Sequence, residues 1–251
     1  MLRVVDPHAE LTWLDDLPGE EAGTGYDVKG WESSTWILHA MYENEQLRHL
    51  GTHDDLRREL LARGLVEPNI IGDVNLDAVT KDSGVPLGFV THPGKDWQRV
   101  EWSDYLGRPL HDVSASEQFP PSFRWFPSGS MPASIQAPPC GSLDDDSLTA
   151  LVEVLLNHAH SDKDAACFAF YGSPPAFGST PTLWSGPLTG IRELVDNDEY
   201  PSTPTNIWPA ARSWLVYTDW DLSGTKVSGS TRLIEGVRDH PDLETVSWPT
   251  D

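Results

Sequence analysis

The first regular spacing of apolar residues lies in residues 31–47 (WESSTWILHAMYENEQL). Trp36, Ala40 and Leu47 recur at or near helical intervals, and Ile37 and Met41 add a second apolar stripe. A period near 3.6 residues is typical of an amphipathic helix. The pattern therefore predicts a helix over this segment.

A second helical pattern follows in residues 52–64 (THDDLRRELLARG). Thr52 with Asp55 three positions later resembles a capping box, and Gly64 is a typical stop. The leucines at 56, 60 and 61 form its apolar stripe. We expect this helix and the preceding one to form a helical hairpin across Gly51.

Residues 70–105 contain short β-branched and aromatic runs, namely NIIGDVNL, PLGFVTH and WQRVEWSDYL. Gly, Pro and Asp bound these runs, which is typical of strands. We expect two of the strands to flank a turn at His92–Lys95. Residues 107–141 are rich in Pro and Ser, and proline favours extended backbone. This long connection is also aromatic, at Phe119, Phe123, Trp125 and Phe126, so it should pack against both halves.

The second half alternates helices and strands. Ser142 or Asp144 begins a predicted helix over 142–160, followed by strands at 164–172 and 182–186 and a helix at 187–197. Residues 206–248 predict a strand, a tight turn, a second strand, a helix and a last strand. We predict an α+β fold, a mainly antiparallel sheet with helices on one face. It would comprise an N-terminal region (1–106), the connection (107–141) and a C-terminal domain (142–251).

Charge narrows the classes of partner. The chain has 39 acidic and 17 basic residues, a formal net charge of −22. Nucleic acids and anionic membranes are repelled by such a chain, because their binding needs Lys and Arg to neutralise phosphates. A basic protein partner would be attracted. A large negative charge can also serve only to keep a protein soluble. The sequence does not distinguish this role from the binding of a basic partner.

The N-terminal thirty residues hold no apolar core of a signal peptide, and no apolar run approaches the ~18 residues of a membrane span. Cys140 and Cys167 lie far apart and form no C-x-x-C motif. Cys167 lies in an apolar run and should be a small buried residue. We expect a reduced, cytoplasmic protein.

Motifs for catalysis and cofactors are missing. The sequence contains no nucleophile elbow, no nucleotide-binding glycine loop and no H-E-x-x-H metal motif, so no cofactor is expected. Asp219, Asp221, Ser223 and Gly224 match the start of a calcium loop, but Ser230 occupies the position of the required Glu. A hairpin turn explains these residues better, with Asp221 accepting turn hydrogen bonds and Gly224 supplying a positive φ. No metal site is predicted.

One group of candidate binding residues remains in the last block. They are aromatic or charged and close in sequence: Trp208, Arg212, Tyr217, Asp219, Asp221 and Lys226. Alternation along residues 213–220 places Leu215, Tyr217 and Asp219 on one face of a strand. If that face is open, these residues form a recognition surface. If both faces are covered, Arg212 should pair with Asp219 in a structural role.

Four short motifs mark the same block: Asn206–Pro209 (NIWP), Arg212–Trp214 (RSW), Thr218–Leu222 (TDWDL) and Lys226–Ser230 (KVSGS). Together with the looser run WILHAMYE at 36–43, they resemble a group of acidic actinobacterial proteins with no assigned activity. The resemblance implies a bacterial cytosolic setting and carries no catalytic residue with it.

Two functions remain open. The first is a non-catalytic interaction protein, such as an immunity-type antidote or accessory factor that binds a basic protein. The second is a small-molecule-binding domain or enzyme, with a pocket between the two halves lined by Trp and by acids such as Asp96, Glu101 and Asp104. The charge and the missing motifs favour the first.

Overall fold

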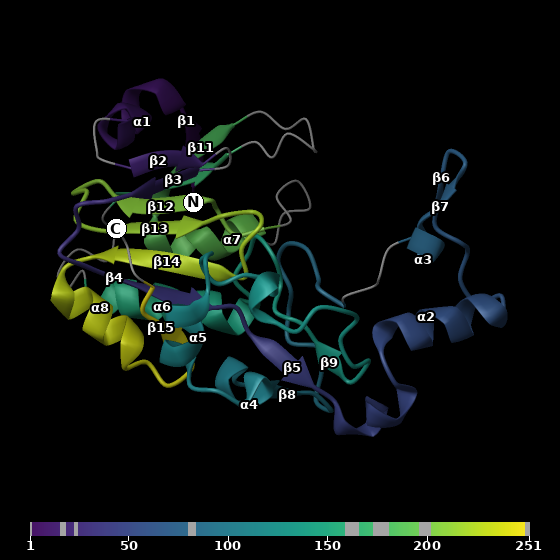
Figure 1. The fold of residues 1–251 in the computed structure, drawn as a ribbon. Coiled ribbons are helices and arrows are strands. Elements are labelled where there is room, and N and C mark those ends of the chain that lie inside the picture. The colour runs from purple at the N-terminus through teal and green to yellow at the C-terminus, as the bar shows by residue number, and fades with distance from the viewer. Residues whose placement is uncertain are drawn as a thin grey trace.

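The structure, a computed structural model, describes residues 2–15, 19–22, 25–79, 84–158, 166–172, 181–195 and 202–248 (Figure 1). Its centre is an eight-stranded sheet in which all neighbouring strands run antiparallel. The predicted α+β fold with a mainly antiparallel sheet is confirmed. In spatial order the strands are β1 (Arg3–Val5), β11 (Thr182–Pro187), β10 (Ala166–Tyr171), β12 (Asn206–Pro209), β13 (Leu215–Thr218), β14 (Gly224–Gly229), β4 (Ser33–Leu38) and β15 (Thr245–Val246).

Three helices pack on one face of this sheet: α6 (Asp145–His158), α7 (Ile191–Val195, after the 3₁₀ turn η4, Leu188–Gly190) and α8 (Thr231–Arg238). Their aliphatic side chains share a core with Val216 and Val227 of the strands. The Asp144 carboxylate begins α6 by accepting from Ser147 N (3.0 Å), as an N-cap residue does. The predicted helices are confirmed over these residues, whereas positions 159, 160, 196 and 197 lie outside the described part.

The opposite face is covered in two places. At one end, α1 (Pro7–Asp15) and the hairpin of β2 (Gly19–Ala22) and β3 (Gly25–Val28) lie over Trp208 and Leu215. At the other end lie α4 (Trp102–Leu106), α5 (Leu110–Ser116), the 3₁₀ turn η2 (Phe123–Trp125) and β9 (Ile135–Gln136). Trp125 and Phe126 are buried there, so the 107–141 connection packs on the sheet. The same connection also forms short helices.

The helix predicted over residues 31–47 is wrong. The chain forms β4, then β5 (Met41–Glu43), then the 3₁₀ helix η1 (Glu45–Leu50). Ile37 points into the core beneath the helices, while Trp36 and Leu38 point into the core on the other face. A strand that is buried on both faces is a continuous apolar run, and periodicity cannot separate it from a buried helix. The predicted helical hairpin is therefore wrong too.

Residues 45–79 form a projection that we call the arm (Figure 1). It contains η1, α2 (His53–Ala62), the hairpin of β6 (Ile70–Ile71) and β7 (Val74–Asn75), and α3 (Leu76–Val79). The predicted capping box is confirmed: Thr52 Oγ1 accepts from Asp55 N at 3.2 Å, and Asp55 Oδ2 accepts from Thr52 N at 2.9 Å.

The strand expected over 86–92 reduces to one bridge, between Leu87 and Cys140, and residues 102–106 are helical instead of extended. Within residues 86–106, only β8 (Gln98–Val100) is a strand, in a three-stranded sheet with order β8-β5-β9. The expected strand pair around His92–Lys95 is therefore wrong.

Backbone pairing crosses the expected division of the chain. β1 and β4 precede residue 106, yet they pair with β11 and β14, which follow residue 142. Whether the two halves fold separately stays a prediction. The shared sheet places N-terminal and C-terminal strands next to each other.

Candidate functional site

Four of the six candidate residues in the last block lie together. Tyr217 of β13 and Lys226 of β14 are register partners. The Tyr217 hydroxyl donates to Asp219 Oδ2 at 2.8 Å, and Asp221 N donates to Asp219 Oδ1 at 2.9 Å. Lys226 Nζ lies 2.6 Å from Asp27 Oδ1 of β3.

Two members of this cluster are buried, whereas Asp219 is half-buried and Asp221 is exposed. Only 3% of the Lys226 side chain is exposed, and Tyr217 is buried against Trp36. Burial raises the pKa of Tyr217 well above its ordinary value, and the Asp219 carboxylate raises it further. A buried ammonium needs its carboxylate partner, so the Lys226–Asp27 pair ties β3 to the sheet. Whether Tyr217, Asp219 and Asp221 bind anything stays a prediction.

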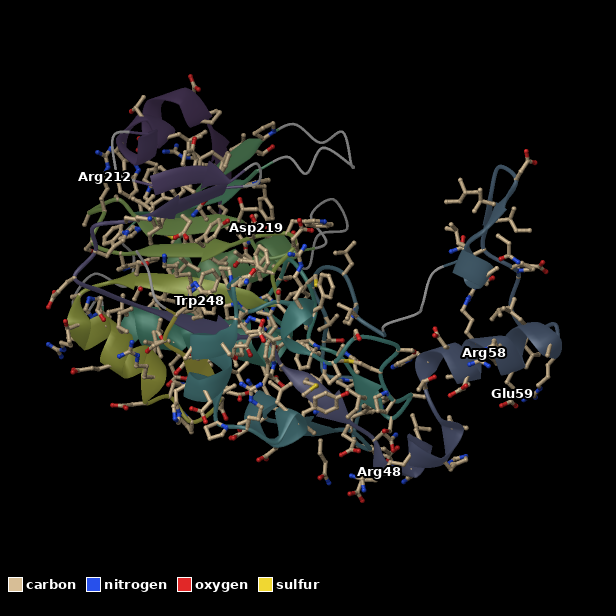
Figure 2. All side chains as sticks on the ribbon, viewed as in Figure 1. Arg48, Arg58, Glu59, Arg212, Asp219 and Trp248 are labelled. Carbon is tan, nitrogen blue, oxygen red and sulfur yellow. The ribbon has the colours of Figure 1, made fainter. Side chains whose placement is uncertain are left out.

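The other two candidates lie elsewhere. Trp208 is fully buried and stacks on Phe168, with ring centroids 5.6 Å apart. Arg212 has a φ of 53° and its guanidinium lies 5.4 Å from the centre of the Trp13 ring and 3.9 Å from Glu10. The expected pairing of Arg212 with Asp219 is therefore wrong, and Figure 2 shows the two residues well apart.

The Asp219–Gly224 stretch joins β13 and β14 as the expected hairpin. Its details differ from the expectation, because Asp219 and not Asp221 accepts the turn hydrogen bond. Gly224 has no positive φ. Glycine is required there by space, since a Cβ would lie 2.9 Å from Pro121 Cβ. Among the described residues, no cluster of His, Cys, Asp and Glu is arranged to hold a metal.

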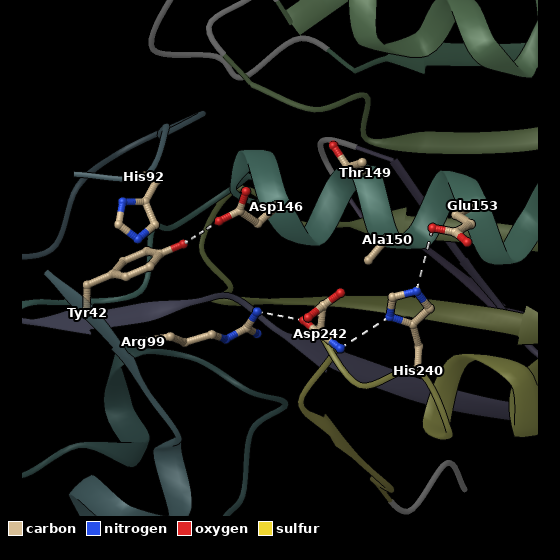
Figure 3. A pocket seen from close by; sticks show the side chains of 9 residues that line it. All are labelled: Tyr42, His92, Arg99, Asp146, Thr149, Ala150, Glu153, His240 and Asp242. Carbon is tan, nitrogen blue, oxygen red and sulfur yellow. Dashed lines mark hydrogen bonds and ion pairs between the residues drawn. The ribbon is translucent and has the colours of Figure 1, made fainter. Parts of the chain in front are cut away.

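A different site lies where the two halves meet. It is a cavity of about 380 Å³, which we call the acidic pocket (Figure 3). Mostly charged and aromatic side chains, from both halves of the chain, line it: Tyr42, His92, Arg99, Asp146, Thr149, Ala150, Glu153, His240 and Asp242.

Local structure explains how these side chains converge. Asp146, Thr149 and Glu153 are spaced by three and four positions, so they share one face of α6. Tyr42 of β5 and Arg99 of β8 are cross-strand partners, which places their side chains on the same face of the small sheet. The pocket is closed by the loop between α8 and β15, which carries His240 and Asp242.

Few bonds hold the polar groups of the pocket. Arg99 Nη1 donates to the backbone oxygen of Asp242 at 2.6 Å, and the Tyr42 hydroxyl lies 3.5 Å from Asp146 Oδ2. His240 Nδ1 accepts from Asp242 N at 3.3 Å, and its Nε2 lies 4.0 Å from Glu153 Oε2. Burial raises the pKa of Tyr42 far above its ordinary value, so it is a neutral hydrogen-bond donor.

The balance of charge in the pocket is negative. Asp146, Glu153 and Asp242 contribute three carboxylates against the one guanidinium of Arg99. All three acids are exposed, Glu153 with 67% of its side chain. No described ion pair neutralises Asp146 or Asp242, and Glu153 has only His240. This arrangement suits a cation.

This pocket has little signal in the sequence because its residues come from four separate segments. Only the helical spacing of Asp146, Thr149 and Glu153 could have pointed to it. The acids expected to line a pocket between the halves, Asp96, Glu101 and Asp104, do not line this cavity. They also do not line the second cavity, of about 390 Å³, that lies against residues 123–131.

Two buried titratable groups lie near the junction of the halves. His39 is fully buried between Pro139 O (2.7 Å) and Thr225 Oγ1 (3.0 Å), and desolvation lowers its pKa to about 4. Burial raises the pKa of Glu244 to about 7, although Trp102 N and Ser103 N donate to its carboxylate.

No protein-family model matches the chain, and no curated protein or solved structure shows a significant similarity to it. Within the described residues, none of the helices combines the length and apolar character needed to span a bilayer.

Proposed function

We propose that this chain is a cytoplasmic interaction protein that binds a basic protein partner, as an immunity-type antidote or accessory factor does. The acidic pocket would receive a lysine or arginine side chain of that partner. One observation carries the proposal: three exposed carboxylates and a single guanidinium line a cavity of about 380 Å³ at the junction of the two halves.

Electrostatic attraction, both at long range and inside the pocket, supports a cationic partner. At long range, the net charge of −22 accelerates encounters with basic proteins and repels nucleic acids and anionic membranes. At short range, a cation in the pocket meets Asp146 and Glu153 from α6 and Asp242 from the loop between α8 and β15. The Tyr42 and His92 rings, 4.8 Å apart, add an aromatic wall against which a lysine or arginine stem can pack.

The exposure of the carboxylates favours a protein over a free small molecule. A small ligand is usually held in a pocket that buries most of its surface. Here Asp146, Glu153 and Asp242 lie exposed around the opening, so a partner laid across it would cover the rim as well as fill the cavity. A small amine ligand or substrate is the second candidate, because the same chemistry would bind it.

Binding of two probes tests the proposal. A lysine-rich peptide and the single-residue amine N-acetyl-lysine methylamide are titrated into the protein by calorimetry. The pocket variant Asp146→Asn/Glu153→Gln is compared with Glu193→Gln/Glu235→Gln, whose exposed acids lie on α7 and α8 outside the pocket. Both variants remove two negative charges, so the comparison separates the place of the lost charge from its amount.

We expect the pocket variant to lose about tenfold in affinity for the peptide, or ~1.4 kcal/mol, and the control variant much less. Equal losses in both variants would show that only the overall charge matters and would refute the pocket. Tight binding of the single amine with no gain from the peptide would instead support the small-molecule function.

A further inference from the structure

Large apolar side chains are exposed in two places on this protein. Of the eight such residues in the described part, four lie on the arm, three lie near the second cavity, and Val4 stands alone. The arm residues are Leu65, Ile70, Ile71 and Val74, and those near the cavity are Leu87, Phe119 and Phe123. Clustered apolar exposure marks a contact surface, whereas scattered apolar residues need no explanation.

The arm has a defined shape but no core. None of its described side chains is buried between residues 45 and 78. Arg57 Nε lies 2.5 Å from Asp77 Oδ1 and so ties α3 to α2, and further ion pairs run along α2, where Figure 2 labels Arg58 and Glu59. A two-stranded hairpin without a covered apolar face is marginally stable in water. The tip at Ile70, Ile71 and Val74 therefore needs a surface to cover it.

A matching surface exists on the body. The second cavity, which we call the socket, has a volume of about 390 Å³ and is lined mainly by apolar groups: Val85, Phe123, Phe126, Pro127 and Met131, with Arg124, Ser128 and Gly129. The Arg124 guanidinium stacks on Phe119, 4.5 Å from the ring centre. In the described part of the chain Arg124 forms no ion pair.

The charges of the tip and the socket are also complementary. The tip, residues 68–76 (PNIIGDVNL), contains a single charged residue, Asp73. Asp73 has no ion-pair partner among the described residues. Among the described residues, Arg124 is the only charged one that lines the socket. One acid on an apolar tip and one base on an apolar socket are complementary.

A single chain does not join the two surfaces, because Ile71 remains 67% exposed and Phe123 remains 49% exposed. Figure 1 shows why: the β6–β7 hairpin stands at the far end of the arm, clear of the body. A second copy offers the same socket. If each arm enters the other chain's socket, both contacts form in one closed two-fold dimer, and no apolar tip is left over to propagate a filament.

We propose that two copies of this chain form a dimer by exchanging arms. Ile70 and Ile71 of each arm enter the socket of the other copy, and Asp73 pairs with Arg124 across the interface. This dimer is independent of the acidic pocket, so the pocket variant Asp146→Asn/Glu153→Gln should leave its mass unchanged.

Sedimentation equilibrium of the full chain tests the dimer, over about 1 to 500 µM where weak and moderate dimers dissociate. We expect Ile71→Asp to weaken dimerisation at least about tenfold, since it removes the burial of one large aliphatic side chain in each of the two contacts. Val4→Asp is the matched control, because Val4 is 58% exposed and belongs to neither surface. A wild-type chain that stays monomeric throughout would overturn the proposal.

Mixed cross-linking tests the partner surfaces. An Ile71→Cys chain is mixed with a Phe123→Cys chain of different mass and oxidised, while the native Cys140 and Cys167 are buried. Arm exchange predicts that the mixed disulfide dominates. If Ile71→Cys chains instead link mainly to each other, the tips pair with tips and the proposed socket is wrong.

A charge exchange adds a second readout. Asp73→Arg and Arg124→Asp should each weaken the dimer by roughly two- to fivefold, as for an exposed ion pair. The double variant should recover most of that loss. Additive losses in the double variant would show that these two residues do not meet.

Discussion

Glu244 provides the sharpest test of the electrostatics. Its carboxylate accepts from Trp102 N at 2.9 Å and from Ser103 N at 3.4 Å, and so caps α4, whose own N-cap residue Glu101 forms no side-chain cap bond. Burial and the nearby Glu101 carboxylate nevertheless raise the pKa of Glu244 to about 7. The perturbation is Glu244→Gln, which keeps the size and an acceptor oxygen but cannot ionise.

The sign of the effect follows from linkage. The unfolded chain releases the Glu244 proton near its ordinary pKa of 4.5, and the folded chain releases it near 7. The stabilising contribution is complete below 4.5 and is lost as pH rises through 7. A difference of 2.5 in pKa corresponds to about 3 kcal/mol, which is an upper bound because Glu244 is only partly buried.

Urea unfolding of the wild type and of Glu244→Gln between pH 4.5 and 8.5 measures this contribution. We expect the unfolding free energy of the variant, relative to that of the wild type, to rise by up to about 3 kcal/mol as the pH increases from 4.5 to 8.5. His39, whose pKa is lowered to about 4, destabilises both proteins in acid and cancels in the difference. A difference that does not change with pH would refute the assignment of a buried carboxylate.

Three further substitutions test local features by the free energy of unfolding. Thr52→Ala removes one half of the capping box and should cost about 1 kcal/mol, with faster amide exchange in α2; unchanged exchange would contradict the cap. Asp27→Ala leaves the buried Lys226 ammonium without its carboxylate partner and should cost roughly 3 kcal/mol. Lys226→Met should cost far less, because it removes the buried charge itself. Equal costs for the two variants would mean that the pair is not buried. Gly224→Ala places a Cβ 2.9 Å from Pro121 and should cost about 1 to 3 kcal/mol, and a neutral result would show that Pro121 moves aside.

The last block was predictable because its signals are local. Ser230 accepts from Leu233 N and begins α8, and the alternation across Leu215, Val216 and Tyr217 matches the two faces of β13. Such signals depend on neighbouring residues only. They survive into the structure because tertiary packing agrees with them.

The first half was harder because tertiary context decides it. Trp36, Ile37 and Leu38 can be a helix or a doubly buried strand, and only the strands on either side of β4 settle the choice. The acidic pocket could not be predicted from the sequence for a related reason. Arg99 and Glu153 are brought together by pairing between distant segments, and no spacing in the sequence records that approach.

The position of β4 in the sheet delays its strand pairing during synthesis of the chain. Ile37 lies between Thr225 of β14 and Thr245 of β15, so neither neighbour exists when the ribosome has just made β4. At 5 to 20 residues per second, about 10 to 40 seconds separate the synthesis of Ile37 from that of Thr225. For that interval the apolar run Trp36–Leu38 has no strand to pair with. Slower translation between residues 37 and 225 should therefore lengthen the time for which this apolar run stays unpaired.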